Sequence, residues 1–195
     1  MMKFVFSLIA LFGLGIGAAE AATTADAPRA PKPYADVKDP ENTLLLKLKD
    51  GDVLIQMFPE DAPNHVARIK ELVRQGFYDG LKFHRVIDGF MAQTGDPRGN
   101  GTGGSGKNLK AEFNNRPHKR GAVSMARAAD PNSADSQFFI CFDDSTFLDR
   151  QYTVWGQVIS GMQAVDKIKR GTGPNGMVYD PDKIISMSVV ADLQK

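Results

Sequence analysis

The pattern of apolar and polar residues divides most of the chain into short segments that begin near residue 41. Residues 44–49 and 53–58 are rich in Leu, Ile and Val, and they flank the dipeptide Asp50-Gly51. Asp and Gly both tolerate the positive φ angles that a two-residue hairpin turn requires. The pattern therefore predicts two antiparallel strands joined at this turn.

A helical period follows the hairpin. Val66, Ile69 and Val73 are spaced by three or four residues, as on the buried face of an amphipathic helix. Pro63 suits the first helical turn, and Asp61 lies where a capping side chain would accept free backbone N–H groups. We expect this helix to cover the core with its apolar face.

The rest of the chain shows short β-like runs that Gly- and Asp-rich turns separate. The expected strands are residues 81–87, 89–94, 121–126, 137–142, 152–159 and 184–190. A second short helix is expected at residues 162–169, where apolar residues recur every three positions. Many short strands and two helices are typical of a mainly β fold, and they favour a closed antiparallel barrel over a βαβ sheet.

The first residues have the three parts of a secretory signal. Lys3 precedes an uncharged, mostly apolar run at residues 4–17, and Ala19 and Ala21 have the small-residue spacing that signal peptidase reads. A membrane anchor is the alternative, but a spanning helix needs about 20 apolar residues and this run is shorter. We expect residues 1–21 to be a cleaved signal peptide that exports the chain.

Composition separates a linker from a folded domain. Residues 22–40 are rich in Ala and Pro, which predicts a flexible linker, whereas residues 41–195 have the make-up of one globular domain. The 24 basic and 23 acidic residues nearly balance, so nucleic acid is not an expected partner. We expect a monomer that has no contact with membrane after signal cleavage. The single cysteine, Cys141, lies in an apolar run and is predicted to be a buried packing residue.

Motifs for metals and cofactors are weak. His65, His84 and His118 lie far apart, without the spacing of metal ligands, and are predicted to be exposed or structural. Residues 101–107 match the phosphate-loop pattern G-x-x-x-x-G-K, but Asn108 replaces the hydroxyl residue that binds Mg²⁺. We therefore expect no metal and no cofactor, and a nucleotide-dependent enzyme is the alternative.

Residues 83–96 carry the densest combination of charged, amide and apolar side chains in the chain. This run carries Arg85 and Gln93 among apolar side chains, with Asp88-Gly89 between them. If the run forms a strand, a turn and a strand, side chains of its two arms face the same groove. Taken alone, Arg85 would also fit a structural ion pair across a barrel.

The run 83–96 resembles the signature of the cyclophilin family. Further segments resemble that family in the same order and spacing, namely residues 101–104, 124–126, 136–140, 147–149 and 154–156. The resemblance extends over roughly residues 43–193. It implies an eight-stranded, closed antiparallel β-barrel capped by two α-helices, and it implies peptidyl-prolyl cis/trans isomerase activity.

The resemblance also implies the roles of individual residues. The expected catalytic residues are Arg85, Phe90 and Gln93. The residues expected to bind substrate are Met91, Ala126, Gln137, Phe139, Phe147, Leu148 and Tyr152. Phe147 and Tyr152 stand where the family often has Trp and His. These departures resemble bacterial members, so we expect the exported protein to be periplasmic, with secretion from the cell as the alternative.

Isomerisation breaks no covalent bond and therefore needs no nucleophile, metal or cofactor. Rotation about a peptide bond is opposed by a barrier of about 18–20 kcal/mol. An enzyme lowers this barrier if it binds the twisted amide more tightly than either planar isomer. Arg85 can donate a hydrogen bond to the nitrogen of the twisted amide. The expected substrates are proline-containing peptides and unfolded exported proteins. A non-catalytic peptide-binding module or holdase chaperone that uses the same groove is the alternative.

Overall fold

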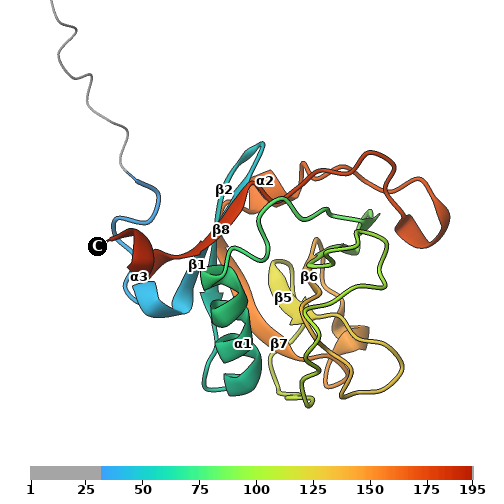
Figure 1. Ribbon diagram of the computed structural model, residues 1–195, viewed down its shortest axis with the longest axis horizontal. Helices are drawn as coiled ribbons and strands as arrows, with labels where there is room; N and C mark the ends of the chain where they lie inside the picture. The colour runs from blue at the N-terminus through green and yellow to red at the C-terminus, as the bar shows by residue number, and fades with distance from the viewer. Residues whose placement is uncertain (1–31, 195) are drawn as a thin grey trace, which may run out of the picture. The chain divides into compact units, whose positions relative to one another are not determined.

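The computed structural model describes residues 32–194 (Figure 1). The expected signal peptide at residues 1–21 lies outside the described residues, as does most of the linker expected at 22–40. Within the described part, no helix is long and apolar enough to cross a membrane.

Eight short strands dominate the described region, as the sequence pattern predicts. They are β1 (Thr43–Leu48), β2 (Gly51–Met57), β3 (Arg85–Ile87), β4 (Met91–Thr94), β5 (Ala122–Met125), β6 (Phe138–Cys141), β7 (Val154–Ser160) and β8 (Ser186–Val189). All pairs of neighbours are antiparallel, and the order in the sheet is β3-β4-β6-β5-β7-β2-β1-β8.

The expected closed barrel is wrong, because the sheet is a curled, open half-barrel. Its edge strands are β3 and β8, and the described residues contain no ladder that joins them. Residues 80–83 approach residues 182–184 through an isolated bridge between Lys82 and Lys183 and a few backbone hydrogen bonds. Strand β3 has three residues, so its regular pairing ends before a continuous ladder can form across this gap.

The hairpin prediction is confirmed. β1 pairs with β2 from Thr43 opposite Gln56 to Leu48 opposite Gly51. The turn is displaced by one residue from Asp50-Gly51, since Gly51 is the first residue of β2 and has a φ of 144°.

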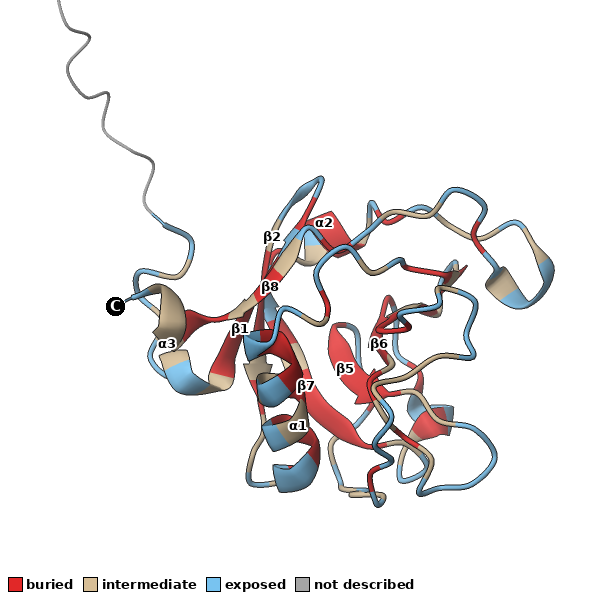
Figure 2. Ribbon diagram, in the orientation of Figure 1, coloured by how far each residue is buried: buried red, intermediate tan, exposed pale blue. Residues whose placement is uncertain are grey.

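The structure has three α-helices, not the two that were expected: α1 (Pro63–Arg74), α2 (Met162–Val165) and α3 (Val190–Leu193). Three 3₁₀ helices accompany them, η1 (Pro40–Asn42), η2 (Thr146–Leu148) and η3 (Pro174–Gly176). The expected helix at residues 162–169 is confined to its first turn, and the expected strand at 184–190 gives way to α3 at its end. Figure 2 shows that α1 turns its buried residues toward the sheet and its exposed ones outward.

The expected cap of α1 is also wrong. Asp61 bonds with Arg116 instead, through an Nε–Oδ2 contact of 2.7 Å. The first turn of α1 is capped from another part of the chain, since the carboxylate of Glu112 accepts the backbone N–H groups of Asn64 and His65 at 3.0 Å each. A carboxylate at this end of a helix also interacts favourably with the helix dipole.

Two apolar clusters lie on opposite faces of the sheet near β4 and β6. Val86, Ala92 and Ile140 belong to the large inner core that α1 covers. The second, smaller cluster contains Met91, Ala122, Phe139, Cys141 and Leu148. Side chains alternate between faces along a strand, so successive residues of β6 belong alternately to the large core and to the smaller cluster. The smaller cluster is the base on which the candidate site is built.

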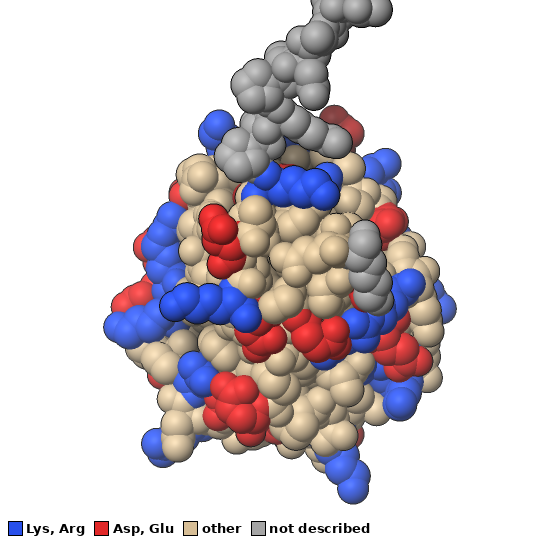
Figure 3. Space-filling view, turned by 90° about the vertical axis from the view of Figure 1, so that its left-hand side faces the viewer, with Lys and Arg blue, Asp and Glu red and all other residues tan. Residues whose placement is uncertain are grey.

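Basic and acidic side chains are intermixed on the face that Figure 3 shows, rather than gathered by sign. This agrees with the formal net charge of +1. The pattern gives no continuous basic surface on that face for nucleic acid to contact.

Candidate active site

The register of the sheet brings two of the expected catalytic residues and one expected substrate-binding residue into one row. Arg85 on β3 lies opposite Gln93 on β4, and Gln93 lies opposite Phe139 on β6. Directly paired residues in antiparallel strands point to the same face of a sheet. Arg85, Gln93 and Phe139 are therefore neighbours on the face that carries the smaller apolar cluster.

A pocket of about 150 Å³ opens on this face. Its walls are formed by Arg85, Phe90, Met91, Gln93, Ala126, Arg127, Phe139, Leu148 and Tyr152. Eight of the ten residues predicted for the site thus lie together. Phe147 is at the rim, where it is 66% exposed and its ring centroid lies 5.4 Å from that of Phe90. Gln137 lies in the neighbouring pocket and reaches this one through Gln93.

The guanidinium of Arg85 is held at two of its three nitrogens. Its Nε donates to the backbone carbonyl of Asn175 at 2.9 Å, and its Nη1 donates to Oε1 of Gln93 at 3.1 Å. Among residues 32–194, no hydrogen bond is formed by Nη2 and no acidic side chain pairs with Arg85. The alternative of a structural ion pair therefore finds no support in the described residues. Burial lowers the pKa of Arg85, but an arginine remains charged at ordinary pH.

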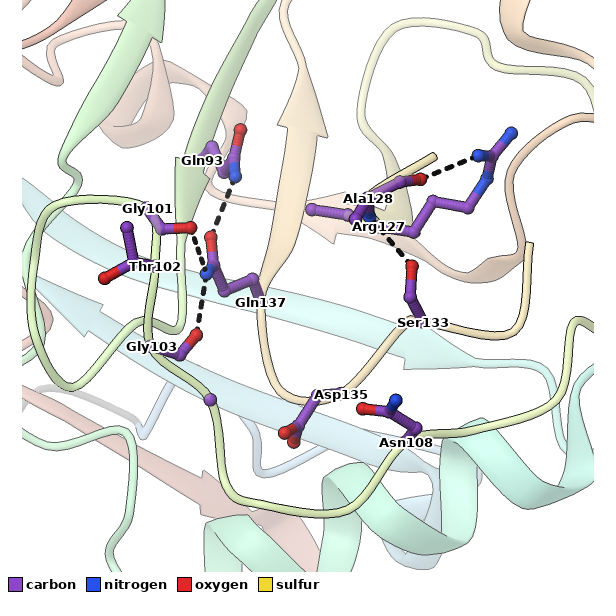
Figure 4. A pocket seen from close by; sticks show the side chains of 12 residues that line it. Gln93, Gly101, Thr102, Gly103, Asn108, Arg127, Ala128, Ser133, Asp135 and Gln137 are labelled. Carbon is purple, nitrogen blue, oxygen red and sulfur yellow. Dashed lines mark hydrogen bonds between the residues drawn. The ribbon is translucent and has the colours of Figure 1, made fainter. Parts of the chain in front are cut away.

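A chain of amides orients this arginine. Because Arg85 can only donate, Oε1 of Gln93 must face it, and Nε2 of Gln93 then donates to Oε1 of Gln137 at 2.9 Å. Nε2 of Gln137 donates in turn to the carbonyls of Gly101 and Gly103, at 3.1 and 2.8 Å. Figure 4 shows the Gln137 amide between Gln93 and these two carbonyls. The direction of every hydrogen bond in the chain follows from the charge of Arg85.

A second pocket of about 310 Å³ adjoins the first. The two pockets share Gln93, Ala126 and Arg127. The second pocket is the more polar, with Ser133 and Asp135 in its wall. Together they form a groove in which an extended peptide can lie with one apolar side chain in the smaller pocket.

Comparison with known proteins decides the family. The model of the family described as "Cyclophilin type peptidyl-prolyl cis-trans isomerase/CLD" matches residues 43–189. The chain belongs to this family. It is thus an enzyme of the peptidyl-prolyl cis-trans isomerase class, and its substrate class is proline-containing peptides.

Related proteins agree along most of the chain. A "Probable peptidyl-prolyl cis-trans isomerase" of Brucella suis is 52% identical over 207 residues, covering 98% of this chain and 99% of that protein. A "Peptidyl-prolyl cis-trans isomerase" of Helicobacter pylori is 46% identical over 138 residues, which cover 69% of this chain and 84% of that one. The crystal structure of the cyclophilin AquaCyp293 from Hirschia baltica superposes with a TM-score of 0.71 and 33% identity, over 79% of this chain and 76% of that chain.

The glycine-rich loop of this cyclophilin is folded around two carboxylates. Asp96 accepts the backbone N–H groups of Arg98, Asn100 and Gly101. Asp135 accepts those of Ser105, Gly106 and Lys107. Burial opposes ionisation of Asp96, but the backbone hydrogen bonds lower its pKa overall. A phosphate loop would offer such N–H groups to a nucleotide, and here side chains of the protein already occupy them. The nucleotide-dependent alternative is therefore disfavoured.

Beneath the cyclophilin pocket lies a buried histidine, His118, which was predicted to be exposed or structural and was not among the expected site residues. The ring of His118 stacks on Phe139 with centroids 6.1 Å apart and 15° between planes. Its Nδ1 lies 2.9 Å from Oδ1 of Asp149, and its Nε2 lies 3.0 Å from Oγ of Ser124. Asp149 directly follows Leu148, so His118 ties two walls of the pocket together. Burial lowers the pKa of His118, although Asp149 acts in the opposite direction.

The hydroxyl of Ser124 lies beside His118, and His118 in turn contacts Asp149. The three residues have the connectivity of a hydrolase triad. Ser124 is fully buried, however, and its hydroxyl donates to the carbonyl of Thr153 at 2.9 Å. A hydroxyl in that position cannot reach a substrate, so the arrangement supports the pocket and offers no nucleophile.

The remaining sequence predictions concern buried groups. Cys141 is fully buried, as predicted, and burial raises the pKa of its thiol to about 12. His65, His84 and His118 are all buried, which agrees with the structural interpretation and not with the exposed one. In the described residues, no three His, Cys, Asp or Glu side chains form a cluster that could hold a metal.

Residues that sequence reasoning missed also line or support the site. Arg127 forms part of both pockets, with its guanidinium 4.6 Å above the ring centroid of Tyr152. Asn175 contacts Arg85 through its backbone carbonyl. Arg127 directly follows the predicted Ala126, and this adjacency is a signal that pointed to it. Nothing near Asn175 in the sequence pointed to Arg85.

Proposed function

We propose that this cyclophilin accelerates rotation about X–Pro bonds by donating a hydrogen bond from Nη2 of Arg85 to the proline nitrogen. The observation that carries the proposal is the state of the guanidinium. Nε and Nη1 are bound within the protein, whereas Nη2 is left without a partner among the described residues, beside the small pocket. A charged donor that is already oriented needs little rearrangement when the reaction begins.

The chemistry of the twisted amide fits this donor. When conjugation is lost, the proline nitrogen becomes pyramidal and regains a lone pair that accepts a hydrogen bond. Planar amides lack this acceptor, so a donor aimed at the nitrogen favours the transition state over both isomers. The pocket lined by Phe90, Met91, Phe139 and Leu148 would hold the proline ring by apolar contact.

Gln93 has two parts in the proposed reaction. Its Oε1 accepts a hydrogen bond from Nη1 of Arg85, and one of its two amide N–H groups donates a hydrogen bond to Gln137. The other amide proton is available to a backbone carbonyl of the substrate. Gln93 would thereby fix one side of the peptide while the other side turns.

The proposed setting is the periplasm, where the enzyme would assist the folding of exported proteins. Support comes from the signal-like pattern at residues 1–21 and from the extended, groove-like binding face. Recovery of the mature chain from a periplasmic fraction, with Ala22 at its N-terminus by mass spectrometry, is the expected result. A full-length chain retained in the cytoplasm would contradict this setting.

The reaction is tested by exchange NMR of a short Ala-Pro peptide with the wild-type protein, Arg85→Ala and Arg116→Ala. Arg116 is a matched control, because it is an arginine that packs on an aromatic ring, Phe58, outside both pockets of the groove. We expect Arg85→Ala to lower kcat/KM by up to about a hundredfold, because ionic hydrogen bonds are among the strongest single contacts. Arg116→Ala should exchange the peptide at the wild-type rate.

The same experiment separates the enzyme from a peptide-binding module or holdase. The exposed ring of Phe147 beside Phe90 gives an apolar edge that an unfolded chain could contact without isomerisation. If the folded wild-type protein binds the peptide but exchange is no faster than in free peptide, the binding module replaces the proposed mechanism. A folded Arg85→Ala variant with full activity would refute the role of Arg85.

A further inference from the structure

A loop near the C-terminus lies directly against the arginine of the site. Asn175 in η3 is 90 residues from Arg85 in sequence, yet its backbone carbonyl accepts the Nε–H of Arg85. Met177, two residues after Asn175, pairs with Arg85 through an isolated antiparallel bridge. The backbone of this loop thus adds a partner to Arg85 on the side opposite Gln93.

The carbonyl of Asn175 owes its direction to an unusual backbone conformation. Asn175 has φ 55° and ψ 24°, in the left-handed region. Glycine adopts this region freely and Asn tolerates it, whereas β-branched residues are strongly disfavoured there. The Asn175 side chain is exposed and forms no hydrogen bond within residues 32–194. The residue therefore acts on Arg85 through its backbone.

Close packing fixes the loop on β3. The backbone N–H of Gly171 donates to the carbonyl of Val86 at 2.9 Å. A Cβ atom at Gly171 would overlap the carbonyl of Gly176, and one at Gly176 would overlap Cγ1 of Ile87. Because Gly171 and Gly176 have no side chains of their own, the loop can pack closely against β3.

We propose that Asn175 is a positioning residue of the isomerase. Its carbonyl and Oε1 of Gln93 hold two nitrogens of the Arg85 guanidinium, so that Nη2 stays directed at the proline nitrogen. This inference rests on the proposed role of Arg85. Because the contact restricts a donor that acts in the transition state, its loss affects turnover more than peptide affinity.

Three variants isolate the backbone effect. Asn175→Val opposes the left-handed conformation, while Asn175→Gly permits it and keeps the carbonyl. Asp180→Val is the matched control, because Asp180 has a similar φ of 51°, an exposed side chain and no contact with Arg85. We expect Asn175→Val to lower kcat/KM about tenfold with peptide affinity within about twofold, and Asn175→Gly to stay near wild type. Asp180→Val should lower the melting temperature as much as Asn175→Val and leave kcat/KM unchanged.

A spectroscopic measurement tests the contact without using activity. The ¹⁵N-resolved Nε–Hε signal of Arg85 should be protected from exchange with water in the wild type, in Asn175→Gly and in Asp180→Val. It should lose this protection in Asn175→Val. Unchanged protection or unchanged kcat/KM in Asn175→Val overturns the positioning role. An active Arg85→Ala variant would instead remove the proposed function on which the inference rests, and the two failures are thereby distinguished.

Discussion

Gln93 and Gln137 are joined by a hydrogen bond of 2.9 Å from Nε2 of the first residue to Oε1 of the second. This bond links the glycine-rich loop to Arg85, because Gln137 donates to the carbonyls of Gly101 and Gly103 while Gln93 accepts from Arg85. The larger pocket is therefore coupled to the smaller one through side-chain amides whose directions are fixed.

Replacing Gln137 by Glu should break this link at the loop. A carboxylate can still accept from Gln93, but it cannot donate to two carbonyl oxygens and would repel them. We expect kcat/KM for a short Ala-Pro peptide to fall about tenfold, because Gln93 would no longer be held in the position that orients Arg85. Exchange NMR measures this rate.

The matched control for that substitution is Gln157→Glu. The amide of Gln157 also donates to two backbone carbonyls, those of Arg120 and Val158, but it lies outside both pockets of the groove. This variant should lose stability and keep its activity per folded molecule. Equal loss of activity in both variants would show that the effect is not specific to the groove.

The cap of α1 by Glu112 predicts a loss of stability without a loss of catalysis. Glu112→Ala removes the acceptor of two backbone N–H groups and of the buried Nδ1 of His65, which lies 2.6 Å from Oε2. Loss of a cap and of a buried partner costs about 1–3 kcal/mol in the free energy of unfolding. Urea unfolding measures this change. Glu60→Ala, which removes an exposed ion pair with Arg116, should change stability by less than about 1 kcal/mol.

Three buried histidines predict that the free energy of unfolding depends on pH. Burial lowers the pKa values of His65, His84 and His118 in the folded protein. The unfolded chain then binds protons more readily, so the stability is fully present above a pH of about 6.5 and declines as the pH falls below it. Each histidine contributes at most about 1.4 kcal/mol per pH unit, until its folded-state pKa is reached.

Urea unfolding between pH 8 and pH 5 tests this dependence. His84→Leu should reduce the slope of stability against pH, because one of the three sites of proton uptake is removed. A further decline below a pH of about 4.5 belongs to carboxylates such as Asp149 and Glu112, whose pKa values are lowered in the fold. Stability that is constant from pH 8 to pH 5 would contradict the histidine account.

Catalysis, by contrast, should not depend on pH between about 7 and 9. The proposed donor, Arg85, stays protonated in this range even though burial lowers its pKa. Burial raises the pKa values of Cys141 and Tyr78, so neither group ionises there. Exchange rates at fixed peptide concentration should form a plateau. A bell-shaped profile would show that a titrating acid or base takes part in the rate-limiting step.

Local patterns accounted for much of the fold and the site. The hairpin and α1 follow from turn chemistry and from the helical period, which depend on residues close in sequence. Arg85 and Gln93 meet because they lie on the two arms of one short hairpin, which the signature run 83–96 contains within itself. The resemblance of later segments of the chain to cyclophilins then supplied Phe139, Leu148 and Tyr152, which line the pocket.

Tertiary structure decided the features that join distant segments. The open edge of the sheet, the cap of α1 by Glu112 and the support of the pocket by His118 all depend on contacts that no local pattern encodes. The Asn175 carbonyl is the clearest case, because a backbone oxygen has the same chemistry at every residue and gains its function only from where the loop places it. The sequence by itself thus determined all but one of the side chains that line the pocket, Arg127 being the exception, while the three-dimensional packing determined what holds them in place.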